Sequence, residues 1–78
     1  MPNYSEIMNF CIAQLASILE IDAGSIPTSA TFASLGLDSA MAVHLVLAVE
    51  EWLGVELYPA VTADYPSLEA FSAYLSSQ

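Results

Sequence analysis

The chain has 78 residues, of which 56% are hydrophobic, and its nine acidic side chains are opposed by no Lys or Arg, giving a formal net charge of −9. This length has room for one small domain, so we expect residues 1–78 to fold as a single unit. So negative a chain is repelled by nucleic acid and by anionic membrane surfaces, which argues against both as partners, whereas a basic protein surface would complement it.

The apolar segments are too short for a membrane span, since the longest, Ala40 to Val49, is interrupted by His44. The first six residues also lack the basic flank of a signal peptide. We therefore expect a soluble, cytoplasmic monomer. A single cysteine, Cys11, excludes an internal disulfide, and one Cys with one His gives no credible metal cluster.

A first helix is predicted over Tyr4–Leu19, capped by Asn3 or Ser5, because apolar residues recur at spacings of three and four. Cys11 is expected there as a small buried hydrophobe rather than a reactive thiol. The predicted inner face consists of Met8, Cys11, Ile12, Leu15, Ile18 and Leu19.

Residues 20–38 read as a long connection, since Gly24, Pro27 and several Ser and Thr residues disfavour helix. Its apolar residues suggest a loop packed across the domain. These are Ile21, Ile26, Phe32, Leu35 and Leu37.

A second helix is predicted from Ser39 to Leu53, with Asp38 as its N-cap and Gly54 as its stop. Gly36 permits the positive φ that a tight entry turn requires. Ser39 falls in the first turn, where unpaired N–H groups and the helix dipole favour negative charge. A solvent-facing hydroxyl there suits attachment of a phosphate, although Asp-Ser before an apolar run is also ordinary helix-start chemistry.

Two apolar sets occur on this helix. The first is most simply core, and the second is either a partner surface or the margin of a broad core stripe. Trp52 is interpreted as either a packing residue or a partner contact. The core set is Ala42, Leu45, Val46, Val49 and Leu53, and the predicted partner-docking face is Ala40, Met41, Val43, His44, Leu47, Glu50 and Glu51.

The last third of the chain predicts an extended segment to Pro59, a short helical turn over residues 60–64 and a final helix from a Ser67 cap to about Ser76. The fold class is therefore all-α, with three longer helices and one short one. The final helix is expected to close the bundle through Leu68, Phe71, Ala73, Tyr74 and Leu75.

An active site within the chain is not predicted. His44 lies five residues after Ser39, roughly 140° around the helix, so it does not face the serine as a base. Glu50 and Glu51 diverge on the helix surface and read as solvated charges rather than an acid–base pair. The chain is therefore interpreted as a non-enzyme.

Three motifs occur in order: Phe32-Ala33-Ser34-Leu35-Gly36, Gly36-Leu37-Asp38-Ser39 and Asp64-Tyr65-Pro66-Ser67. Together they resemble the acyl carrier proteins, most closely those of polyketide synthases, over nearly the whole chain. The resemblance implies a four-helix bundle with a long loop between its first and second helices. It also implies that Ser39 carries 4′-phosphopantetheine, with Gly36, Leu37 and Asp38 as the supporting motif.

The resemblance further implies a function and partners. A phosphopantetheinyl transferase would load the arm from coenzyme A, and an acyltransferase or acyl ligase, a ketosynthase and other synthase enzymes would use the thioester. Ala40 stands where the family usually has Leu, and His44 where many relatives have Glu. We therefore expect docking to depend more on apolar contact than on charge.

Three alternatives remain beside the polyketide assignment. A peptidyl carrier often has Gly-Gly-x-Ser where this chain has Gly-Leu-Asp-Ser, and a fatty-acid carrier usually has a more acidic second helix. An acidic helical interaction module that is never modified is the alternative from a different class.

Overall fold

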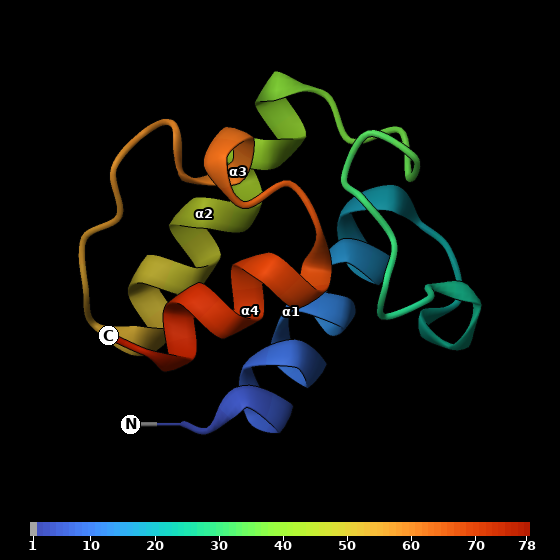
Figure 1. Ribbon diagram of the computed structural model, residues 1–78. Helices are drawn as coiled ribbons and strands as arrows, with labels where there is room; N and C mark the ends of the chain where they lie inside the picture. The colour runs from blue at the N-terminus through green and yellow to red at the C-terminus, as the bar shows by residue number, and fades with distance from the viewer. Residues whose placement is uncertain (1) are drawn as a thin grey trace.

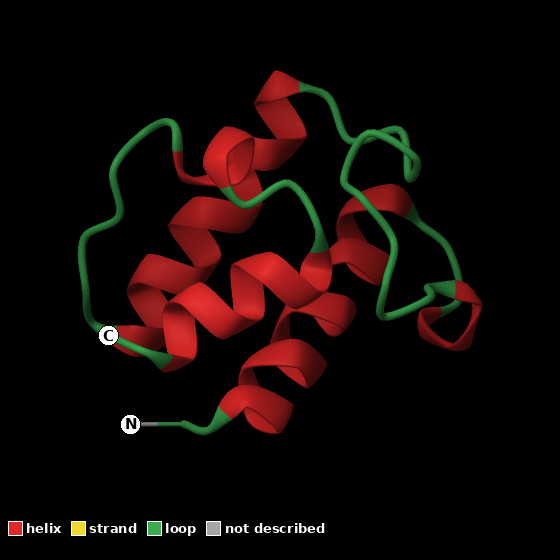
Figure 2. Ribbon diagram, viewed as in Figure 1, coloured by secondary structure: helices red, strands yellow, loops and turns green. Residues whose placement is uncertain are grey.

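The computed structural model describes residues 2–78; Met1, the first residue of the predicted domain, lies outside that range. Helices α1 (Tyr4–Leu19), α2 (Ser39–Leu53), α3 (Val61–Asp64) and α4 (Leu68–Ser76) follow in order, with a 3₁₀ turn, η1 (Ala23–Ser25), in the first loop (Figures 1 and 2). Residues 2–78 contain no strand, only an isolated bridge between Thr31 and Ser67. The all-α prediction with one short helix is confirmed.

The helix ends follow local capping chemistry. Asn3 and Glu6 form a reciprocal capping box, in which Asn3 Oδ1 accepts from Glu6 N–H at 2.9 Å and Glu6 Oε1 from Asn3 N–H at 3.0 Å. Ser67 Oγ accepts from the N–H of Ala70 at the start of α4. Gly54 ends α2 with a left-handed φ of 68°.

The core lies where α1 packs against both α4 and α2. Two of its details differ from the sequence prediction. Ile7 is fully buried although it was not assigned to the inner face, and Ala73 is exposed while its neighbour Ser72 is buried. The buried hydrophobic residues are Ile7, Met8, Cys11, Leu15, Ile26, Phe32, Leu45, Val49, Val61, Leu68, Phe71 and Leu75.

Cys11 occupies this core, as predicted. Burial raises the pKa of its thiol to about 12, against a smaller lowering effect of a hydrogen bond with Ser72. The side chain is therefore a neutral thiol at physiological pH, which is the form with low reactivity.

The first loop is packed through Phe32, whose ring meets Phe71 of α4 edge to face at 5.7 Å. Backbone bonds from Phe32 N–H to Pro66 O and from Leu68 N–H to Ala30 O tie it to the start of α4. Ile21 was expected to pack there as well, but it is 42% exposed. It follows Glu20, whose left-handed backbone (φ 56°) ends α1 and turns the chain away.

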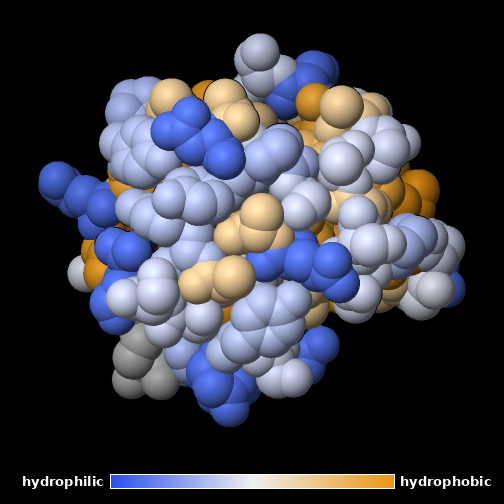
Figure 3. Space-filling view, in the orientation of Figure 1, coloured by the Kyte–Doolittle hydropathy of each residue, from blue (hydrophilic) through white to orange (hydrophobic). Residues whose placement is uncertain are grey.

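The view of the surface in Figure 3 shows hydrophobic residues in patches between hydrophilic ones rather than as one continuous area. Within residues 2–78, no helix combines the length and apolar character needed to cross a membrane.

Candidate functional site

Ser39 is exposed at the first position of α2. Asp38 caps the helix as predicted, with its Oδ1 accepting from Met41 N–H at 2.8 Å. Gly36 has the expected positive φ of 78°, and Leu37 N–H bonds back to Phe32 O at 3.0 Å. This hydrogen-bonded turn fixes the entry to α2 and leaves the Ser39 hydroxyl accessible.

The surroundings of Ser39 favour a phosphate ester rather than a nucleophile. The unpaired N–H groups of the first turn and the helix dipole stabilise negative charge there. His44 is exposed on another face of α2, so it is not placed to take the Ser39 proton. Residues 2–78 contain no group of three His, Cys, Asp or Glu side chains that could hold a metal ion.

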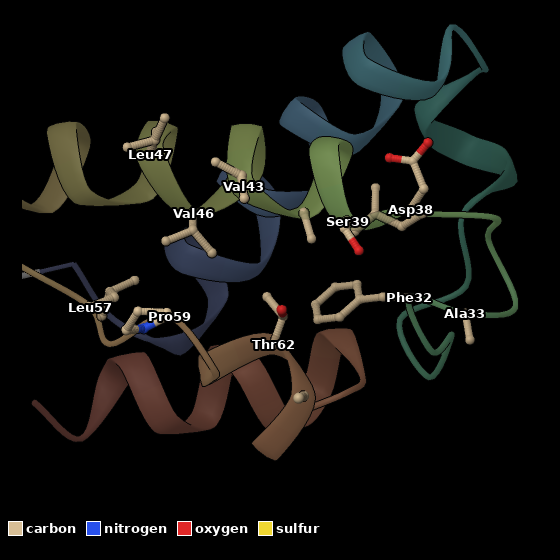
Figure 4. Close-up of a pocket in the computed structure, with 13 residues that line it drawn as sticks. Phe32, Ala33, Asp38, Ser39, Val43, Val46, Leu47, Leu57, Pro59 and Thr62 are labelled. Carbon is tan, nitrogen blue, oxygen red and sulfur yellow. The ribbon is translucent and has the colours of Figure 1, made fainter.

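A groove of about 530 Å³ begins at Ser39 and runs between α2 and the α3 region. In Figure 4 the Ser39 hydroxyl points toward this groove, whereas the Asp38 carboxylate points the other way. The walls are mostly apolar. They are formed by Phe32, Ala33, Leu37, Asp38, Ser39, Ala42, Val43, Val46, Leu47, Leu57, Pro59, Thr62 and Ala63.

The groove wall opposite α2 is held by two carboxylates. Glu50 Oε2 accepts from Leu57 N–H at 2.7 Å, and Asp64 Oδ2 accepts from the Tyr58 hydroxyl at 2.8 Å. Glu50 is therefore a half-buried tether between α2 and the following loop, not the solvated charge that the sequence suggested. The reason is non-local, because its partner lies in a loop seven residues later.

The predicted docking face is only partly on the surface. Val43 and Leu47 are 57% and 58% exposed, and Ala40, His44 and Glu51 are exposed as well. Met41 and Glu50 are half-buried. Trp52 stacks on Phe10 of α1 and keeps 39% of its surface exposed, so it both packs and faces solvent.

Sequence reasoning missed the groove residues outside α2, chiefly Leu57, Pro59 and Thr62. The only sequence signal for these three residues was a short apolar segment after Gly54, which has to pack against another element to be buried. Their approach to α2 depends on the Glu50 tether and the position of α3, neither of which leaves a local pattern.

The sequence family described as "Phosphopantetheine attachment site" matches residues 12–75, a span that includes all of α2 and the groove. No curated protein is significantly similar to the chain in sequence.

Several solved structures share the fold over nearly the whole chain. A free-standing peptidyl carrier protein from Acinetobacter baumannii is 27% identical with a TM-score of 0.91, and the match covers 96% of this chain and 94% of that one. The HMG-ACPI domain of the CurA module from Lyngbya majuscula is 31% identical (TM-score 0.87; 96% and 76% covered). An acyl carrier protein from Anabaena sp. with a variant phosphopantetheinylation-site sequence is 29% identical (TM-score 0.87; 96% and 85% covered).

Proposed function

The chain belongs to the phosphopantetheine-attachment family of carrier proteins, and from this we propose that Ser39 bears the 4′-phosphopantetheine arm and carries acyl intermediates of polyketide type as thioesters. The observation that carries the proposal is the exposed Ser39 hydroxyl in the capped first turn of α2. Tethering raises the effective concentration of the cargo at each partner enzyme, so the carrier needs no active site of its own.

The groove beside Ser39 supports an acyl cargo. Its walls are apolar side chains from α2, the first loop and the α3 region, and the chain contains no Lys or Arg to pair with a carboxylate. A neutral, apolar acyl group would gain from burial there, whereas a carboxylated one would lose hydration without gaining a partner.

The solved relatives include one described as a peptidyl carrier protein and others described as acyl carrier proteins. An aminoacyl load is therefore the second candidate. Its protonated amine would be attracted by the net charge of −9, but the apolar groove walls offer it no specific place. These walls favour the acyl load.

The proposed partners are a phosphopantetheinyl transferase and synthase enzymes such as an acyltransferase or acyl ligase and a ketosynthase. Their docking surface on this chain is centred on Val43 and Leu47, because both side chains are exposed and both border the groove that starts at Ser39. A mixed basic and apolar partner surface complements this face.

Incubation with coenzyme A and a broad-specificity transferase, followed by intact mass measurement, tests the attachment. We expect the gain of one phosphopantetheine, its loss in Ser39→Ala and its retention in Ser29→Ala, a change at another exposed serine. An unmodified parent protein, or a modified Ser39→Ala variant, would overturn the assignment and leave the unmodified interaction module as the better explanation.

A second experiment separates the two loads. The transferase is supplied with pantetheine arms bearing a short apolar acyl group or an aminoacyl group, and amide exchange at Val46 and Leu57 is measured in each loaded protein. We expect the acyl group alone to slow exchange there, since it alone enters the groove. Equal exchange with both loads would count against the acyl preference.

A further inference from the structure

An aromatic pair joins α1 to α2 beside Glu51, the last residue of the predicted docking face, and outside the groove at Ser39. The rings of Phe10 and Trp52 stack with centroids 4.1 Å apart and planes 2° apart. Trp52 is nevertheless 39% exposed, so one large aromatic side chain is held in a fixed position at the surface. Binding of a partner to Trp52 would therefore cost little conformational entropy of this side chain.

Around this pair, Gln14, Ala48 and Glu51 complete a shallow depression of about 510 Å³. None of the five residues lines the groove beside Ser39. Trp52 lies thirteen residues after Ser39 on the same helix, which is about 20 Å along the helix axis, and it projects from a different side. A ligand in this depression would therefore leave Ser39 accessible.

The depression combines an aromatic surface with an uncompensated carboxylate. Glu51 is exposed, the chain holds no Lys or Arg to pair with it, and within residues 2–78 no hydrogen bond reaches the Glu51 carboxylate or the Gln14 amide. A guanidinium group suits this combination, because it is planar, stacks on aromatic rings and donates two parallel N–H bonds to a carboxylate.

Electrostatics argue against three other possible ligands of this depression. A second copy of this chain also carries −9 with no Lys or Arg, and nucleic acid is repelled by the same charge. A purely apolar segment would bury the Glu51 carboxylate without a partner. We propose that the depression of Phe10, Gln14, Glu51 and Trp52 binds an arginine side chain of a basic partner protein, at a surface separate from the Ser39 groove.

Trp52 is the only tryptophan in the chain, so its fluorescence reports directly on this surface. The probes are a short alanine-based helical peptide with two arginines one turn apart and the same peptide with two lysines. We expect the arginine peptide to change Trp52 fluorescence and to bind about threefold more tightly than the lysine peptide, as an exposed cation–π contact allows.

Matched variants separate a specific site from attraction to the net charge. Glu51→Gln should weaken arginine-peptide binding about threefold or more, whereas Glu56→Gln, which removes an equal charge from an exposed position after α2, should change it less than about twofold. Ser39→Ala should bind like the parent, so the outcome does not depend on the carrier assignment. Absence of binding, equal affinity for both peptides, or equal losses in Glu51→Gln and Glu56→Gln would overturn the proposal.

Discussion

Asp38 has two separable properties, the oxygen that caps α2 and the negative charge next to the serine. Its Oδ1 accepts from Met41 N–H at 2.8 Å, and its carboxylate points away from the groove in Figure 4. An amide at this position can still cap, while it presents no charge to a modifying enzyme. The residue therefore allows a stability role to be distinguished from a recognition role.

Asp38→Ala should lower the free energy of unfolding by about 1 kcal/mol because the cap is lost, whereas Asp38→Asn should cost clearly less. Urea denaturation followed by circular dichroism measures both. If the transferase reaction slows equally in the two variants, Asp38 contributes to recognition through its charge. Equal stability losses in Ala and Asn would contradict the capping role.

Glu20 is the one non-glycine residue within residues 2–78 with a positive φ, 56°. An L side chain in this region costs about 1–2 kcal/mol, and glycine avoids that cost at a helix C-terminus. Glu20→Gly should therefore stabilise the fold by about 1 kcal/mol relative to Glu20→Gln, which removes the same charge but keeps the side chain. The comparison uses urea midpoints, and a Gly variant no more stable than the Gln variant would contradict it.

At the scale of elements, the boundaries of α1, α2 and α4 could be predicted because the signals are local. Asn3, Asp38, Gly54 and Ser67 each act on backbone groups within a few residues of themselves. The proposed attachment motif at Ser39 depends on more than these local signals, because it is assigned through the resemblance of three motifs spread along the chain. The helix bounds agree with the predicted ranges to within about one residue.

Features that depend on contacts between distant segments could not be predicted. Ser72 is buried because α4 packs on α1, where its hydroxyl lies 3.9 Å from the sulfur of Met8. Glu50 is a tether because the loop after α2 returns to it. The groove wall around Thr62 depends on where α3 lies. None of these relations leaves a periodic pattern in the sequence.

The exposed face of α2 leads to a prediction about docking. Leu47→Glu replaces a side chain that is 58% exposed and borders the groove, so it should weaken binding to a transferase or synthase partner. Glu50→Gln should weaken it less, because the new amide oxygen can still accept from Leu57 N–H while one charge is removed. Surface plasmon resonance with one partner measures both, and the opposite order would refute apolar docking.

The hydrogen bond from the Tyr58 hydroxyl to the Asp64 carboxylate joins α3 to the loop before it, and it exists only while the Tyr58 hydroxyl is protonated. The pKa of Tyr58 is raised to about 12, first because water is removed from around the hydroxyl and then because the Asp64 carboxylate accepts its hydrogen bond and opposes the phenolate. The ordinary tyrosine pKa is about 10. Since the folded value is the higher one, the stabilisation is complete below pH 10 and is lost as the pH rises toward 12.

Alkaline difference absorbance between the parent and Tyr58→Phe isolates this ionisation among the four tyrosines. We expect a midpoint of about 12 in the parent, and a lower midpoint in Asp64→Asn because the opposing charge is gone. Circular dichroism confirms that the protein is still folded over the titration. A midpoint near 10 in the folded parent would contradict the hydrogen bond.

For the whole molecule, nine acidic side chains share a small surface without a single Lys or Arg to offset them. No pairing of these carboxylates with Lys or Arg is possible within the chain, so the fold depends on apolar burial and backbone hydrogen bonds against mutual repulsion. Two carboxylates, Glu50 and Asp64, are used as hydrogen-bond acceptors that hold the groove wall. The same excess charge makes basic partners favourable in general, so a specific partner has to be distinguished by shape and apolar contact.

This repulsion predicts an unusual response to salt. Raising sodium chloride from about 0.01 M to about 0.15 M shortens the Debye length from about 30 Å to about 8 Å, which is less than the dimensions of the domain, 28 × 23 × 19 Å. Most carboxylate pairs are then screened, while no ion pair with Lys or Arg is present to be weakened, so the melting temperature should rise. The rise should shrink near pH 4, where carboxylates with ordinary pKa values are partly protonated. A melting temperature that falls with added salt at neutral pH would mean that attraction, and not repulsion, dominates the electrostatics of this fold.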